Sequence, residues 1–158
     1  MSSPAHGRYP YRPVSPAPPH PALRMHVQYV ALCDQVIVGA DGRPSLIGVV
    51  NDVTAPQLPV TLPRLAFAAR ILFSNAESGR SYRVEVAITD PNGVEVGRPG
   101  GDVTLPAAPA GVESVAVDIP LHFDLFELKS SGRYTFLLHV DGKASAAVQL
   151  SVRQAANA

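Results

Sequence analysis

Residues 115–152 read VAVDIPLHFDLFELKSSGRYTFLLHVDGKASAAVQLSV, and apolar side chains recur at alternate positions through most of this stretch. Alternation is typical of a half-buried β-strand, because successive side chains point to opposite faces of a sheet. Asp141-Gly142, between two such runs, predicts a tight hairpin turn. The side chains predicted for the buried face are Val115, Val117, Ile119, Leu121, Phe123, Leu125, Tyr134, Phe136, Leu138, Val140, Ala144, Ala146, Val148, Leu150 and Val152.

The same pattern continues toward the N-terminus. SYRVEVAITD at 81–90 alternates, while ADGRP at 40–44 and DPNG at 90–93 predict further turns. Three prolines in TAPQLPVTLP, 54–63, predict a crossing loop rather than a central strand. Residues 97–111 predict a second long loop that has room for a short strand inside it. No convincing helical pattern is present. We therefore predict an all-β fold, an antiparallel two-sheet β-sandwich of immunoglobulin-like or C2-like type with about 7–9 strands.

The chain divides by composition into three parts. Seven of the first 21 residues are proline, which predicts a disordered Pro-rich tail over residues 1–24. The β-sandwich domain is expected over 25–154, with a flexible C-terminus at 155–158. The tail can be interpreted as a polyproline ligand for an SH3-type groove or as a plain spacer.

Charge and hydropathy argue against several functions. Lys and Arg total 13, as do Asp and Glu, but Arg8, Arg12 and Arg24 lie in the tail and leave 10 basic against 13 acidic residues after it. A body with an acidic excess is a poor match for a phosphate backbone, so nucleic-acid binding is not expected. The N-terminal residues lack the apolar segment of a signal peptide, and no apolar run reaches membrane-spanning length. These observations predict a soluble cytoplasmic protein with no membrane association.

Cys33 is the only cysteine, so no intramolecular disulfide can form. A catalytic thiol needs a nearby histidine or a helix N-terminus to lower its pKa, and His122 or His139 could approach it across the sheets. Its place in an apolar strand favours a small buried side chain instead. No zinc spacing, phosphate cradle or nucleophile elbow is present. We therefore expect no enzyme activity and no cofactor.

Asp34 interrupts a run that is otherwise largely apolar from Val30 to Val38. One interpretation is a bulge that turns the carboxylate outward or onto backbone donors. The other is a calcium site, for which the weak candidates are Asp34, Asp52, Asp90 and Asp124. No D-x-D-x-D loop supports a calcium site, and Asp90 occupies a turn position that Asp favours for backbone reasons.

Several of these motifs occur together in a known group. LCDQVIV, GADGRPSLIGVVNDV, LPRLAFAARI and GRYTFLLHVDG resemble a bacterial group, domain-of-unknown-function family 6941, over about residues 26–152. Leu32-Cys33-Asp34 and Ile47-Gly48 are the most specific parts of the resemblance. It implies an all-β bacterial protein with no assigned activity, and it supplies no catalytic residues. The Pro-rich tail lies outside it.

Three functional hypotheses follow. The first is a non-catalytic interaction or structural module that meets a protein partner through exposed edge strands or its long loops. The second is a ligand- or metal-binding sandwich that uses loop carboxylates. The third is an enzyme that employs Cys33 with a histidine. Partner identity, strand order and oligomeric state are not specified by the sequence.

Overall fold

A computed structural model describes residues 24–156. The expected disordered tail falls on residues outside this range, except for Arg24, and the last two residues of the expected flexible C-terminus also lie outside it. The strands are β1 (Met25–Val38), β2 (Pro44–Val49), β3 (Asp52–Ala55), β4 (Val60–Ser74), β5 (Ser81–Thr89), β6 (Glu95–Gly97), β7 (Gly100–Thr104), β8 (Ser114–Leu128), β9 (Gly132–Val140) and β10 (Lys143–Gln154), with one 3-10 turn at Asn75–Glu77.

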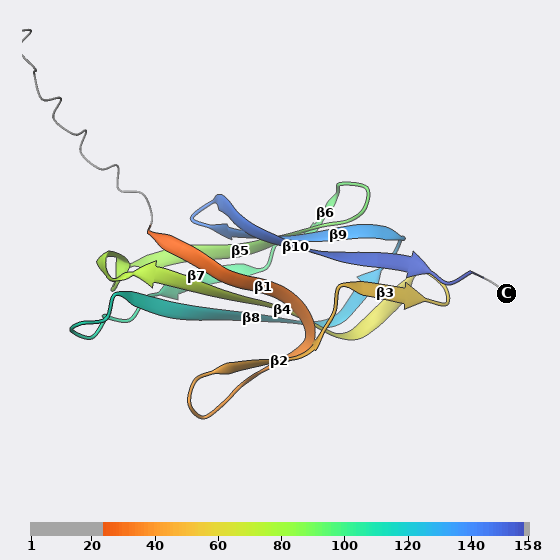
Figure 1. Ribbon diagram of the computed structural model, residues 1–158. Helices are drawn as coiled ribbons and strands as arrows, with labels where there is room; N and C mark the ends of the chain where they lie inside the picture. The colour runs from red at the N-terminus through yellow and green to blue at the C-terminus, as the bar shows by residue number, and fades with distance from the viewer. Residues whose placement is uncertain (1–23, 157–158) are drawn as a thin grey trace, which may run out of the picture.

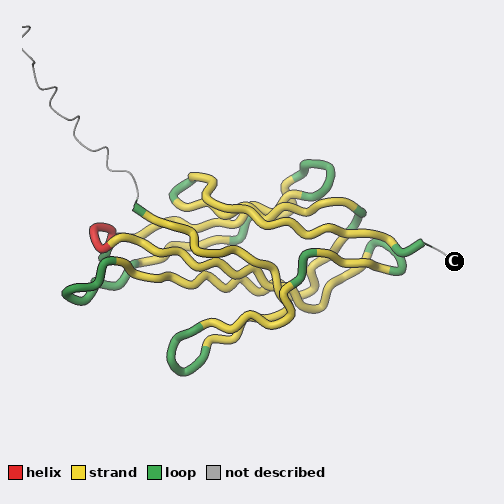
Figure 2. Tube along the Cα trace, in the orientation of Figure 1, coloured by secondary structure: helices red, strands yellow, loops and turns green. Residues whose placement is uncertain are grey.

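The strands form two sheets, which confirms the all-β prediction. Sheet A has the order β2-β1-β4-β8, and sheet B has the order β3-β10-β9-β5-β6, with β7 also paired to β5. Figure 1 shows the sheets as two layers, and Figure 2 shows that strands make up most of the described chain. The ten strands exceed the predicted count because short segments such as β3 and β6 pair beside the long strands.

One pair departs from the predicted antiparallel arrangement. β3 runs parallel to β10, with Asp52 opposite Ser151 and Ala55 opposite Gln154, whereas the other pairs are antiparallel. The chain leaves sheet A after β2 and crosses to the outer edge of sheet B. There β3 runs in the same direction as its neighbour β10, the last strand of the chain. Neither strand's own residues encode this pairing.

The core lies between the sheets. Phe67 and Phe73 of sheet A and Phe136 of sheet B are among the largest fully buried side chains, and Phe73 stacks on Tyr82 at a centroid distance of 5.0 Å. The alternation in β5 and β9 is confirmed, because the buried side chains in these two strands include Tyr82, Val84, Val86, Ile88, Tyr134, Phe136, Leu138 and Val140.

Leu125 and Ala144 correct the predicted core. Leu125 adopts a left-handed φ of 57° and is 71% exposed. This residue shifts the alternation by one position, so the inward-facing side chains after it are Phe126 and Leu128. Ala144 is exposed at a register shift between Ala144 and Ala146 in β10. Single irregularities of this kind reverse the face that a period-two pattern predicts.

The predicted loop at 54–63 is correct only in part. Pro56 and Pro59 lie between β3 and β4, but Pro63 lies inside β4. Its neighbours Leu62 and Arg64 both pair with residues of β8. β1 pairs with β4 only from Ala66 onward, so the other side of Pro63 has no strand to bond. A proline is tolerated at such a position because its missing N–H breaks no ladder.

Candidate functional site

β1 changes partner halfway along its length. It pairs with β4 from Met25 to Cys33 and with β2 from Cys33 to Val38. Beyond Cys33 the strand therefore continues only as half of a hairpin, which we call the arm and define as residues 34–49. Figure 1 shows the arm extending beyond the layer formed by β1, β4 and β8.

The predicted ADGRP turn closes the arm. The amide of Gly42 donates to the carbonyl of Gly39 at 2.9 Å, and the Arg43 amide donates to Asp41 Oδ1 at 3.0 Å. Gly42 has a φ of 77°, a conformation that glycine adopts at little steric cost. The hairpin prediction for this stretch is confirmed.

Asp34 lies at the point where β1 leaves β4. Its side chain is exposed and packs directly over Gly48 on the opposite strand, which has a φ of 67° and no side chain of its own. The carboxylate therefore reaches solvent, and no charge is buried in an apolar strand. The carboxylate turns outward, as one interpretation expected, but the β1–β2 register is continuous across Asp34, so the strand has no bulge there. The adjacent glycine provides the room for the side chain.

The arm packs on the outer face of sheet A. Val36 and Cys33 form a small buried cluster with Ala66 and Ala68 of β4, and Tyr29 and Leu46 pack at its margin. The two alanines alternate with core residues along β4, so they face away from sheet B. Their small side chains allow the arm to approach the sheet closely.

Cys33 is fully buried in this cluster, which confirms the interpretation as a buried thiol. Burial raises the pKa of the Cys33 thiol, and Sγ contacts the carbonyl oxygen of Gln35 at 3.5 Å. His122 lies on the same face, since Ala66 pairs with both Cys33 and His122. Its Nε2, however, accepts the amide of Val36 at 3.4 Å. The histidine thus holds the arm backbone.

The arm also exposes apolar side chains. Ile37 is 44%, Val38 55%, Ile47 47% and Val49 60% exposed, and these are half of the large exposed hydrophobic residues within residues 24–156. β2 carries no charged residue. Exposed apolar side chains concentrated on one hairpin are typical of an interaction surface.

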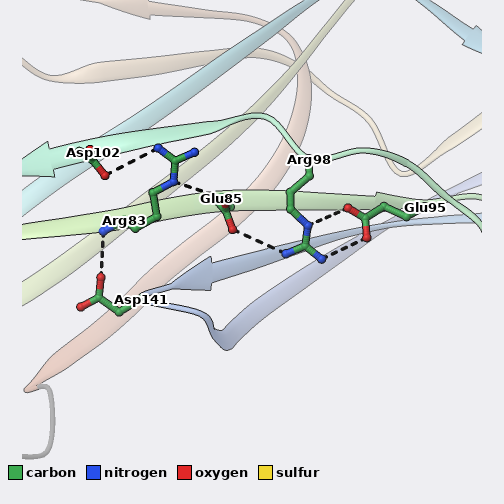
Figure 3. Close-up of polar contacts among 6 residues, drawn as sticks. All are labelled: Arg83, Glu85, Glu95, Arg98, Asp102 and Asp141. Carbon is green, nitrogen blue, oxygen red and sulfur yellow. Dashed lines mark hydrogen bonds and ion pairs between the residues drawn. The ribbon is translucent and has the colours of Figure 1, made fainter.

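The outer face of sheet B has the opposite character. Arg98 Nε lies 2.7 Å from Glu95 Oε1, and this hydrogen bond lowers the pKa of Glu95. Arg98 also contacts Glu85 at 3.7 Å. Mutually paired charges of this kind are typical of a solvated surface. Figure 3 shows these ion pairs, in which Arg83 and Arg98 contact Glu85, Glu95 and Asp102. It also shows Asp141, which accepts the backbone amide of Arg83.

The four carboxylates considered as metal ligands do not converge. Asp52 is paired with Arg153 at 3.0 Å, and Asp90 Oδ1 accepts the amides of Asn92 and Val94 in its own turn. Asp34 and Asp124 do line one cavity of about 320 Å³, together with Arg64 and His122. Within residues 24–156, no three His, Cys, Asp or Glu side chains are grouped closely enough to hold a metal ion.

Sequence reasoning missed the arm as a functional element. The available signal was SLIGVV, an almost continuously apolar run directly after a hairpin turn. A strand that is solvated on one face alternates, whereas a continuous apolar run indicates a strand that is covered on both faces. In the structure, Leu46 packs at the margin of the small cluster on β4, whereas Ile47 and Val49 are exposed.

A family model, described as a family of unknown function (DUF6941), matches residues 28–153. This chain belongs to the DUF6941 family. The match runs from β1 to β10, so it includes both sheets and the arm, and it confirms the resemblance found in the sequence. A comparison with curated proteins finds no match.

Two solved structures show similarity of shape. One is the Pseudomonas fluorescens alkylpurine DNA glycosylase AlkC bound to DNA containing an abasic site analog, with a TM-score of 0.51 and 9% identity over 83% of this chain. This chain spans only 31% of that protein. The other is the CARDB domain of the PF1109 protein from Pyrococcus furiosus in complex with di-metal ions, with a TM-score of 0.36 and 12% identity over 82% of this chain and 92% of that one. The first similarity concerns the fold alone.

Among residues 24–156, no helix has the length and apolar character that a membrane crossing requires.

Proposed function

We propose that this protein is a non-catalytic interaction module of the bacterial cytoplasm and that the arm is the element that binds a protein partner. The observation that carries the proposal is the exposure of Ile37, Val38, Ile47 and Val49 on one projecting hairpin. The sandwich is the scaffold that holds this hairpin, whether its type is immunoglobulin-like or C2-like.

Binding would use strand addition. β2 is the outermost strand of sheet A, so within residues 24–156 its backbone groups on the side away from β1 have no strand partner. An extended segment can bond to such an edge through its main chain, while alternate side chains supply specificity. Ile47 and Val49 lie at the positions where the side chains of an added strand would make contact.

A displayed library of random peptides tests this function. We expect selection on the wild-type protein to enrich apolar peptides with high β propensity. Val49→Lys should weaken binding of the enriched peptides by at least about tenfold, because a charge then stands where an apolar side chain packed.

Val96→Lys is the matched control, since Val96 is also an exposed strand valine, 53% exposed, but lies on sheet B. It should leave peptide binding unchanged. Failure to enrich any peptide, or equal binding by Val49→Lys and the wild-type protein, would contradict the proposal.

A second candidate function rests on the cavity shared by Asp34, Arg64, His122 and Asp124. Asp34 and Asp124 line the same cavity, which favours this cavity as the ligand- or metal-binding site. Asp52 and Asp90 are not part of it, because each is already paired elsewhere. Calcium titration monitored by the melting temperature distinguishes the two functions. The interaction module predicts no shift, whereas a rise that Asp124→Asn abolishes would favour the ligand site.

A further inference from the structure

The edges of the two sheets differ in how well they are protected against association. β8, the other outer strand of sheet A, carries Asp118, Pro120, Asp124 and Glu127. β3, the outer strand of sheet B, has four residues and an Asp52–Arg153 ion pair. Charge, proline and short length are the usual protections of an edge strand. β2 has a proline at its first residue and no charge.

The lack of charge on β2 selects among partners. The side chains of Ser45, Leu46, Ile47 and Val49 offer no charge to an acidic or basic segment, and the nearest charge is the carboxylate of Asp34 beside Gly48. An identical strand meets no repulsion there, since antiparallel pairing about a two-fold axis places uncharged residues opposite uncharged residues. The whole chain is also formally neutral at pH 7, so two copies do not repel each other as a whole.

We propose that the partner of the β2 edge is a second copy of this chain, paired antiparallel so that the two arms form one continuous four-stranded layer. The inference rests on the proposed function and names its partner. In this arrangement Ile47 and Val49 of one copy lie beside the apolar residues of the other arm.

The arm tip is compatible with this pairing. In an antiparallel dimer the tip of each arm lies alongside the base of the other. The charged residues of the tip, Asp41 and Arg43, are paired with each other at 3.6 Å, so the tip brings no net charge to the contact. A contact built on a six-residue strand is small, and we expect a reversible dimer rather than an obligate one.

Sedimentation equilibrium of the full chain tests the inference. We expect the wild-type protein to be in monomer–dimer equilibrium at micromolar concentrations. Ile47→Lys and Val49→Lys should each raise the dissociation constant by at least about tenfold, since each variant places a charge where an apolar side chain would lie against the partner arm. Val96→Lys should leave the dissociation constant unchanged.

Two results would overturn the inference: a wild-type protein that remains monomeric throughout, or a dimer that persists in both arm variants. Ile47 and Val49 are both exposed, so we expect both lysine variants to fold. The thermal unfolding transition of each variant checks this, and the second variant keeps the test valid if the first does not fold. Peptide selection that depends on Val49 in a purely monomeric protein would leave the interaction module standing and remove only the second copy as its partner.

Discussion

At the scale of single residues, the contact between Asp34 and Gly48 determines how the arm leaves the sheet. The side chain of Asp34 fills the space beside Gly48, and a Cβ added to Gly48 would lie 3.2 Å from Asp34 Cβ and closer still to the carboxyl group. Rotation of the carboxylate does not remove this contact. The sequence identified Asp34 as an unusual residue, but its neighbour lies on the returning strand, at a distance that depends on the register and on a positive φ.

We expect Gly48→Ala to be more destabilising than a glycine substitution that adds only conformational strain. Gly42 supplies the control, because its φ is 77° and nothing lies within 4 Å of an added Cβ. We predict losses in the free energy of unfolding of about 1 kcal/mol for Gly42→Ala and about 2–4 kcal/mol for Gly48→Ala. Urea denaturation measures both, and equal losses would show that Asp34 does not press on Gly48.

At the scale of elements, the arm is held by a hydrogen bond and by a small apolar cluster. The turn residues Asp41-Gly42 made the hairpin predictable, because they encode a local geometry. The change of partner at Cys33 was not predictable, since both halves of β1 are strand and only the tertiary arrangement shows where β4 ends its pairing. The alternation in β8 placed His122 on the polar, outward face of the strand. Its contact with Val36 could not be predicted, because the two residues are 86 positions apart in the sequence.

Loss of the His122 acceptor should loosen the arm. The amide of Val36 then lacks its side-chain partner, so we expect His122→Ala to speed the hydrogen exchange of that amide by roughly fivefold, the equivalent of about 1 kcal/mol. His139→Ala, on the outer face of sheet B, is the control. NMR-detected exchange reports the two variants, and an unchanged Val36 rate in His122→Ala would disprove the role of His122.

At the scale of the whole molecule, the two-layer architecture followed from alternation, because the buried faces of β5 and β9 needed a second sheet to cover them. The parallel β3–β10 pair did not follow from alternation, because nothing in a four-residue strand specifies which strand of the other sheet it will pair with.

Tyr82 joins the two layers, since it stacks on Phe73 and donates its hydroxyl to the buried Glu77.

Tyr82 predicts how stability depends on alkaline pH. Burial, followed by the hydrogen bond to Glu77 and its charge, raises the pKa of Tyr82 from 10.0 to about 12. The folded state therefore holds this proton more tightly than the unfolded state. The contribution to stability is complete below pH 10 and is lost as the pH rises toward about 12.

We expect the free energy of unfolding of the wild-type protein to fall more steeply across this alkaline interval than that of Tyr82→Phe, which has no phenol to ionise. Urea denaturation at a series of pH values gives both slopes. Parallel slopes would indicate that Tyr82 titrates alike in the folded and unfolded states.

Hydrogen exchange followed as a function of protein concentration shows whether a second copy covers the free edge of β2. If two copies pair through their arms, amides within residues 45–49 will become more protected as the concentration rises, while those of the β8 edge will not change. If the β2 amides exchange equally fast at all concentrations, or if protection appears on β8 instead, the arms do not pair with each other.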